Sequence, residues 1–229
     1  MQGRPTLGQP IPIPGRPTVV VPFAIESEKG LFEKDDPYSR GGIQPQRYSY
    51  LASVGKPGGY AMGDVRWHNA IIHDLKTGEE WPILDRRGII GRWEILGIPP
   101  KHDEPFVVRA ILFIAVLDDT NHDGLLDDRD ARVAILTDAD GRHPRAITPA
   151  NAQVWDTSYD PEKDMIFLRV ATDTSSDGRF TYEDEALPYA LAADATTPAV
   201  PVIAAATLTR VKQWLTDKER GQPRAGEGR

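Results

Sequence analysis

The sequence contains no cysteine. Disulfide scaffolds, thiolate zinc sites, iron–sulfur clusters and cysteine nucleophiles are therefore excluded. A chain without cysteine suits either redox environment, so this absence does not decide the compartment. The sequence also lacks any run near the ~20 apolar residues that a membrane-spanning helix needs, and residues 1–17 lack the apolar stretch of a signal peptide.

Positive charge is in short supply as well. The chain has 27 Lys and Arg against 34 Asp and Glu, a net charge of −7, and this balance disfavours a general nucleic-acid-binding protein. Its 229 residues correspond to one large domain or two small ones. A chain of this length can bury a core without a disulfide or a metal.

Turn-forming residues and β-branched residues dominate the chain. Twenty glycines and twenty prolines separate short runs of β-branched and aromatic residues, a pattern that indicates strands. We expect strands at 18–24, 47–54, 67–74, 80–84, 89–96, 106–117, 132–137, 145–148, 152–157, 164–171, 187–193 and 199–204. The run 106–117 is apolar throughout except for Arg109, which predicts a strand buried on both faces.

The two ends of the chain differ from this middle. Residues 1–17 carry five prolines and predict an extended segment that stays outside the sheets, either a disordered leader or an arm that docks on a partner. Residues 205–229 predict a helix followed by a flexible tail. Thr207 is the expected cap, Leu208, Val211, Trp214 and Leu215 the apolar face, and Gly221 the stop. Residues 18–204 form the predicted β domain.

Three strand–turn–strand units recur in this domain, with turn aspartates at Asp74, Asp138 and Asp194. In the second and third units an acidic loop precedes the last two strands. The pattern predicts an all-β fold of three four-stranded, propeller-like blades, which form a partial or open propeller because closed propellers have about four to eight blades. Exposed edges of such blades are expected to be covered by another copy, by a different subunit, or by the N-terminal arm and the helix at 207–220.

Residues 133–170 resemble the repeat of TolB-type β-propellers. The likeness consists of a strand, the turn Asp138-Ala-Asp140-Gly141, an apolar pair with a threonine, and a Tyr-x-Asp-x-x-Lys segment before the next strand. Residues 69–84 resemble this repeat more loosely. The resemblance implies propeller blades over about residues 45–203. The Asp138–Gly141 turn is too short to wrap a cation, and we interpret it as a hairpin turn.

Two twelve-residue loops, 119–130 and 173–184, contain the candidate metal ligands. Both place oxygen-bearing side chains at positions 1, 3, 5, 9 and 12, glycine at position 6 and an apolar residue at position 8. This spacing suits a hard cation such as Ca²⁺, which takes six to eight oxygens at about 2.3–2.6 Å and also uses the backbone carbonyl at position 7. The predicted ligands of the first loop are Asp119, Asn121, Asp123, Leu125, Asp127 and Asp130, and those of the second are Asp173, Ser175, Asp177, Arg179, Thr181 and Asp184.

These loops resemble the calcium loops of EF-hand and dockerin proteins. Position 12 is aspartate, as dockerin-like loops allow, and strands rather than helices precede both loops. The resemblance therefore implies two Ca²⁺ ions held by the loops alone, without the helix pair of a sensor. The alternative is a pair of Asp-Gly-rich turns that bind nothing.

The charge distribution favours the calcium interpretation. The loops hold nine acidic and two basic residues, while the rest of the chain holds 25 of each sign, so the whole net charge of −7 lies in the two loops. Carboxylates crowded in this way repel one another unless a cation lies between them.

Other side chains give weaker signals. The five histidines do not form a spacing typical of a metal or acid–base site, and no G-x-S-x-G elbow is present. The tryptophans at 67, 81, 93 and 155 are interpreted as core packing, with a sugar-stacking platform as the alternative.

The sequence thus predicts a non-enzymatic, calcium-binding scaffolding subunit. Millimolar calcium outside the cytoplasm would fill such loops, which favours a periplasmic or extracellular location. Two alternatives stay open, a carbohydrate- or polymer-binding module that uses exposed tryptophans and a calcium-dependent hydrolase.

Overall fold

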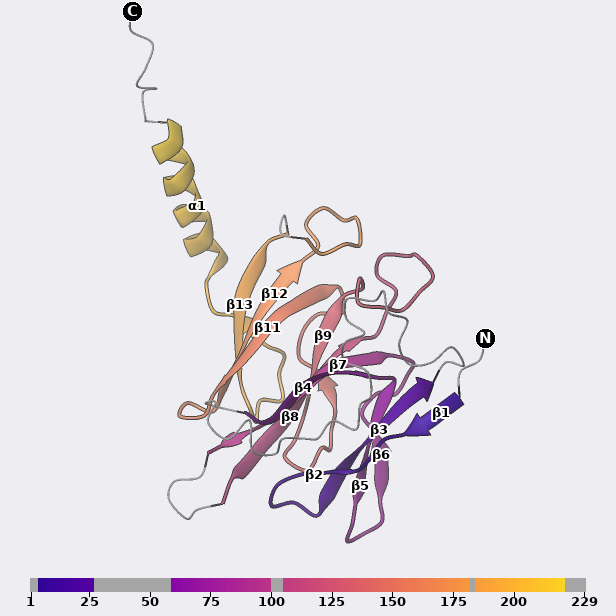
Figure 1. Ribbon diagram of the computed structural model, residues 1–229. Coiled ribbons are helices and arrows are strands. Elements are labelled where there is room, and N and C mark those ends of the chain that lie inside the picture. The colour runs from indigo at the N-terminus through magenta and orange to yellow at the C-terminus, as the bar shows by residue number, and fades with distance from the viewer. Residues whose placement is uncertain (1–3, 27–58, 100–104, 182–183, 221–229) are drawn as a thin grey trace, which may run out of the picture.

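The structure is a computed structural model that describes residues 4–26, 59–99, 105–181 and 184–220 (Figure 1). These residues form antiparallel strands and one C-terminal helix, so the expected β-rich architecture with a helix at its end is confirmed. The strands build three sheets, here called sheets A, B and C in chain order.

Sheet A is formed by the first part of the chain. Its strands pair in the order β1-β3-β5-β6, and β2 pairs with β3 on the same side as β1. The strands are β1 (Arg4–Leu7), β2 (Ile11–Pro12), β3 (Thr18–Glu26), β5 (Asn69–Asp74) and β6 (Glu80–Pro82).

Sheet B has the order β10-β9-β8-β7-β4, and sheet C is the meander β11-β12-β13-β14. The strands of sheet B are β4 (Gly59–Trp67), β7 (Ile89–Ile98), β8 (Val107–Val116), β9 (Arg132–Thr137) and β10 (Arg145–Ala146). Those of sheet C are β11 (Ala152–Asp160), β12 (Met165–Thr172), β13 (Ala186–Ala192) and β14 (Val200–Pro201).

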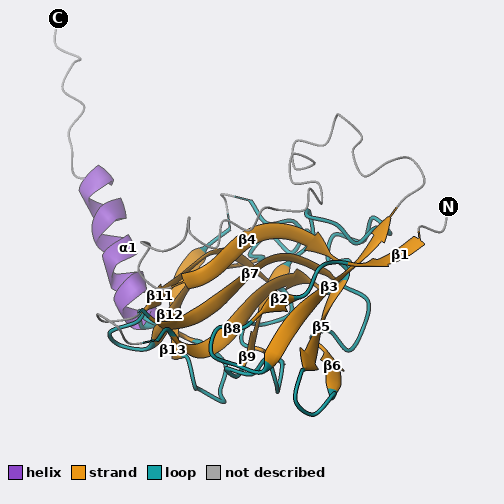
Figure 2. Cartoon of the chain, turned by 60° about the horizontal axis from the view of Figure 1, so that its bottom comes forward, coloured by secondary structure: helices purple, strands orange, loops and turns teal. Residues whose placement is uncertain are grey.

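Sheet B is the central layer of the molecule. Alternate residues of a strand point to opposite faces, and on β8 Ile111 and Phe113 pack in a core with sheet A, while Leu112 and Ile114 pack in a second core with sheet C. The prediction that β8 is buried on both faces is therefore confirmed. Figure 2 shows the strands of these sheets stacked in layers.

The expected pattern of three equal four-stranded blades is met only in part. Sheet C has four strands, but sheets A and B have five each, and none of the three closes on itself. The predicted strand 47–54 lies outside the described residues. Sheet A is completed instead by strands from the N-terminus, and β4 adds to the edge of sheet B beside β7.

The expectation that residues 1–17 form a separate arm is corrected by this arrangement. β1 and β2 both pair with β3, and Ile13 is only 1% exposed and belongs to the core between sheets A and B. Pro5 and Pro12 fit because they lie in strands that pair on one side only, where a residue without an N–H is tolerated. Burial of Ile11 and Ile13, which alternate with the prolines, holds this segment on sheet A although the prolines predicted that it would stay outside the sheets.

The C-terminal helix α1 (Ala205–Arg220) extends away from the sheets, at the opposite end of the molecule from β1 (Figures 1 and 2). It begins before Thr207, whose N–H already donates to the carbonyl of Ala204, so Thr207 is not the cap. The expected apolar face faces solvent, since Trp214 and Leu215 are 61% and 63% exposed.

Candidate metal-binding loops

The two predicted calcium loops occupy equivalent places in neighbouring sheets. Loop 1 (residues 119–130) joins β8 to β9 in sheet B, and loop 2 (residues 173–184) joins β12 to β13 in sheet C. Both lie at the same end of the molecule, beyond the ends of β8 and β12 (Figure 1). Residues 182–183 of loop 2 are outside the described residues.

The first carboxylate of each loop holds the bend at the glycine. Oδ2 of Asp119 accepts a hydrogen bond of 2.8 Å from the N–H of Gly124, and Oδ2 of Asp173 accepts one of 2.8 Å from Gly178. The two glycines have φ of +83° and +73°, a left-handed conformation in which a side chain is strained. The conformation explains why glycine stands at position 6 in both loops.

The carboxylate at position 5 accepts from the backbone two residues later in both loops. The N–H of Leu125 donates to Asp123 at 2.9 Å, and that of Arg179 donates to Asp177 at 2.8 Å. Such Asx-turns are the local bonds that aspartate offers a tight loop. The two loops therefore share one backbone course through the bend.

The last carboxylate closes each loop on its beginning. Asp130 accepts from the N–H groups of Thr120 and Asp127, both at 2.9 Å. In loop 2 Asp184 accepts in the same way from positions 2 and 9, Thr174 at 3.0 Å and Thr181 at 2.8 Å. Asp130 and Asp184 are 1% and 7% exposed. They are the two buried acids of the loops among the described residues.

The threonine at position 2 was not singled out from the sequence. Its hydroxyl donates to the closing carboxylate in both loops, from Thr120 to Asp130 at 3.4 Å and from Thr174 to Asp184 at 3.1 Å. The shared Asp-Thr at the start of both loops is the sequence feature that could have pointed to this threonine.

Backbone donors also set the charge state of loop 2. The N–H of Gly178 is the largest influence that lowers the pKa of Asp173, and the N–H groups of Thr181 and Thr174 lower the pKa of Asp184 most. Each hydrogen bond favours the ionised carboxylate that it contacts. Both groups are therefore carboxylates at neutral pH, the form that ligates a cation.

The remaining predicted ligands lie along the same two loops. Oδ1 of Asn121 accepts from the N–H of Asp123 at 2.9 Å, and Asp127 accepts from Arg129 at 2.9 Å. In loop 2 the hydroxyl of Ser175 donates to Asp173 at 3.1 Å. The side chain of Leu125 has no ligand atom and is 59% exposed, and only its backbone carbonyl would serve a cation.

The loops do not gather a complete ligand set around one point. Within the described residues, no group of three or more His, Asp or Glu side chains is arranged to hold a metal ion. Each carboxylate named above is bound to backbone N–H groups of its own loop. The residue types and their order fit a hard cation, and calcium binding stays a prediction.

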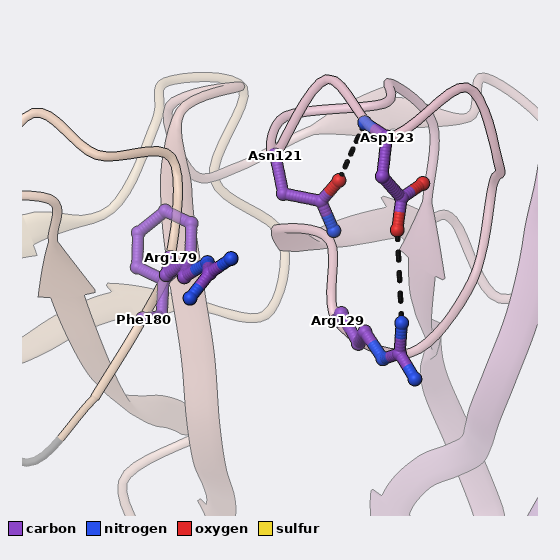
Figure 3. Close-up of a pocket in the computed structure, with 5 residues that line it drawn as sticks. All are labelled: Asn121, Asp123, Arg129, Arg179 and Phe180. Atoms are coloured by element: carbon purple, nitrogen blue, oxygen red, sulfur yellow. Dashed lines mark hydrogen bonds and ion pairs between the residues drawn. The ribbon is translucent and has the colours of Figure 1, made fainter.

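A pocket of about 440 Å³ lies between the two loops (Figure 3). Asn121, Asp123 and Arg129 line it from loop 1, and Arg179 and Phe180 line it from loop 2. Arg129 forms an ion pair of 3.7 Å with Asp123. The pocket brings the side chains of two loops, whose first residues are 54 positions apart in sequence, to a common space.

The Asp138–Gly141 turn is the hairpin turn that we expected, and it lies against sheet A. Asp138 accepts from the N–H groups of Asp140 and Arg142, and Gly141 has φ of +77°. Its carbonyl accepts a bond of 2.7 Å from the indole of Trp81. The turn thus joins sheet B to sheet A.

The tryptophans do not form a shared platform. Trp67 and Trp93 are 5% and 2% exposed, with ring centroids 5.5 Å apart in the core. Trp155 is 38% exposed. Trp67 and Trp93 therefore pack in the core, as the sequence predicted for them.

No family model, curated protein or solved structure matches this chain. Within the described part of the chain, the search for a helix with the length and apolar character needed to cross a membrane finds none.

Proposed function

We propose that this protein is a non-enzymatic, calcium-stabilised scaffolding subunit of an extracytoplasmic assembly. The observation that carries the proposal is the pair of equivalent loops, which share a ligand order, a hydrogen-bond pattern and the left-handed glycine at position 6. Two independent Asp-Gly turns would have no reason to agree at so many positions.

Electrostatics supports a cation in each loop. The loops carry the whole net charge of −7, and they lie beside each other (Figure 3). Repulsion among the carboxylates is offset when a divalent ion lies between them. The protein is expected to hold two Ca²⁺ ions, and each filled loop would anchor the ends of two neighbouring strands.

The scaffolding part of the proposal draws on α1. Val211, Trp214 and Leu215 are 40%, 61% and 63% exposed, and large apolar side chains that gather on a surface mark sites where other proteins bind. A location outside the cytoplasm is part of the proposal because calcium there is millimolar, which suffices for loops of weak affinity.

The test is a calorimetric titration of chelator-treated protein with Ca²⁺. We expect two sites and a rise in melting temperature, because an ion that binds only the folded state stabilises it by about 2.7 kcal/mol per site at a hundredfold excess over Kd. Mg²⁺ should substitute poorly, since it demands a compact octahedral site.

Variants assign the sites. Asp123→Ala should abolish the site in loop 1, and Asp177→Ala the site in loop 2. Asp128→Ala is the matched control, because it removes one charge from loop 1 at a position that is not a predicted ligand. No heat with Ca²⁺ and no shift in melting temperature would reject the proposal. Loss of binding in Asp128→Ala equal to that in Asp123→Ala would reduce it to a general charge effect.

A further inference from the structure

Exposed apolar side chains are concentrated at α1 and in the segment that leads into it. Among the described residues twelve large apolar side chains are exposed, and six of them lie within residues 200–215. These six, exposed by 37–63%, are Val200, Val202, Ile203, Val211, Trp214 and Leu215. The last three are separated by three and four positions and therefore share one face of α1.

This face of α1 has no support from the sheets of its own chain. None of the side chains described over residues 205–215 is buried, and the helix extends away from the sheets (Figures 1 and 2). α1 has 16 residues, and the β-branched Thr207, Thr209 and Val211 lower its helix propensity. Helices near this length are marginal in water unless an apolar face packs against another element. A partner on this face would supply that packing.

The exposed area fits a second copy of the chain. The six side chains together present on the order of 600 Å² of apolar surface. A stable interface takes about 800 Å² from each partner, of which a little more than half is apolar. Two copies that meet through this surface supply the required area without another protein. A twofold-symmetric dimer is also the commonest closed assembly.

The charges beside the apolar face permit such an approach. Lys212 lies next to the face, and its Nζ forms an ion pair of 2.6 Å with Glu185 of its own chain. The guanidinium of Arg210 lies over the ring of Trp214, 5.4 Å from its centroid. Two copies therefore do not bring unpaired lysines together. A membrane is the other common partner of an amphipathic helix, but an anionic bilayer repels a chain with a net charge of −7.

We infer that residues 200–203 and α1 form an interface with a second copy of this chain, in which the apolar faces of two α1 helices pack against each other. The inference deepens the scaffolding part of the proposed function, because it names the partner, and it does not require calcium. The interface is small, so we expect a Kd of about 1–100 µM. Dissociation should leave the sheets folded, because none of the described α1 side chains is buried against them.

Sedimentation equilibrium of the full chain, at concentrations on both sides of this range, measures the association. Val211→Glu places a charge in the apolar face and should raise Kd at least about tenfold. Thr209→Glu is the matched control and should keep the wild-type Kd, because positions 209 and 211 do not share a helix face. Both variants replace a β-branched residue with a better helix former, so loss of the dimer in Val211→Glu would not reflect melting of α1. The helical signal of the wild-type protein in circular dichroism should also rise with concentration.

Other results would overturn the inference. A wild-type chain that stays monomeric over the whole range would do so, and so would a dimer whose Kd is the same in Val211→Glu. Monomeric wild-type protein that sediments with vesicles of phosphatidylcholine and phosphatidylglycerol, while Val211→Glu does not, would assign the face to a membrane instead. Calcium titration separates the two proposals. A dimer that gives no calcium heat would uphold this inference and reject calcium binding, whereas a monomer with two calcium sites would do the reverse.

Discussion

Arg109, the charged side chain within the apolar strand β8, donates a hydrogen bond of 2.8 Å from Nε to Oδ2 of Asp164 in the turn between β11 and β12. The hydroxyl of Tyr159 donates to the other oxygen of the same carboxylate. The bond from Arg109 joins sheet B to sheet C, and the bond from Tyr159 holds the carboxylate within sheet C. They explain why an arginine interrupts an otherwise apolar strand.

The Asp164 carboxylate predicts a pH-dependent contribution to stability. Desolvation acts to raise the pKa of Asp164, but the hydrogen bonds from Arg109 and Tyr159 outweigh it and the pKa lies below its usual 3.8. A lowered pKa stabilises the fold above the unfolded value, and this contribution is lost as the pH falls through the folded value. Asp164→Asn should therefore cost about 1–2 kcal/mol at pH 7, and the difference from wild type should shrink towards pH 3.

Urea unfolding of both proteins between pH 3 and 7 measures this difference. Asparagine is suitable because residue 164 has φ of +54°, a conformation that asparagine tolerates. A difference between the two proteins that does not change with pH would show that the carboxylate charge contributes nothing.

The N-terminal residues should be part of the stable fold. Ile13→Ala removes a side chain that is 1% exposed in the core between sheets A and B, and it should cost about 2–5 kcal/mol. Leu7→Ala is the control, because Leu7 in β1 is 60% exposed and should change stability by less than about 0.5 kcal/mol. Chemical denaturation measures the free energy of unfolding of both variants. If both substitutions change it equally little, residues 4–17 do not contribute to the stable fold and form a separate arm.

The hydrogen bond from the indole N–H of Trp81 to the carbonyl of Gly141, which links sheet A to the turn after β9, should contribute to the free energy of unfolding. Trp81→Phe keeps a ring beneath the guanidinium of Arg142, which lies 4.0 Å from the ring centroid, but leaves the Gly141 carbonyl without its bond from Trp81. We expect a loss of about 1–2 kcal/mol in the free energy of unfolding. Trp214→Phe on the exposed helix is the control and should be neutral. No loss in Trp81→Phe would mean that water replaces the bond.

Removal of α1 should leave the sheets intact. None of the side chains described over residues 205–215 is buried. The ion pair of Lys212 with Glu185 at 2.6 Å joins partly exposed groups, and such pairs contribute about 0–1 kcal/mol. A chain that ends at residue 204 should therefore unfold within about 1 kcal/mol of the full chain in the same denaturant series. A larger loss would show that the helix packs on the sheets in solution.

The sequence by itself determined the features that depend on neighbours along the chain. β9 spans the predicted residues 132–137, and β8 and β12 differ from their predictions by a residue at each end, because alternation of apolar residues between turns is a local property. The candidate ligand order of loops 1 and 2 and their left-handed glycines are local as well. The ligand order and the glycine at position 6 were predicted from twelve consecutive residues in each loop, and the left-handed conformation of these glycines was found in the structure.

The tertiary structure decided which strands share a sheet and which loops meet. Pairing of β1 and β2 with β3 depends on burial of Ile11 and Ile13 against residues of sheet B. The number of prolines in residues 1–17 does not show whether these two side chains are buried. The addition of β4 to β7 and the close approach of Gly178 to Thr120 likewise join residues that are 23 or more positions apart. Such pairings bring together distant parts of the chain, and they form only when the side chains of the three sheets pack together across the layers.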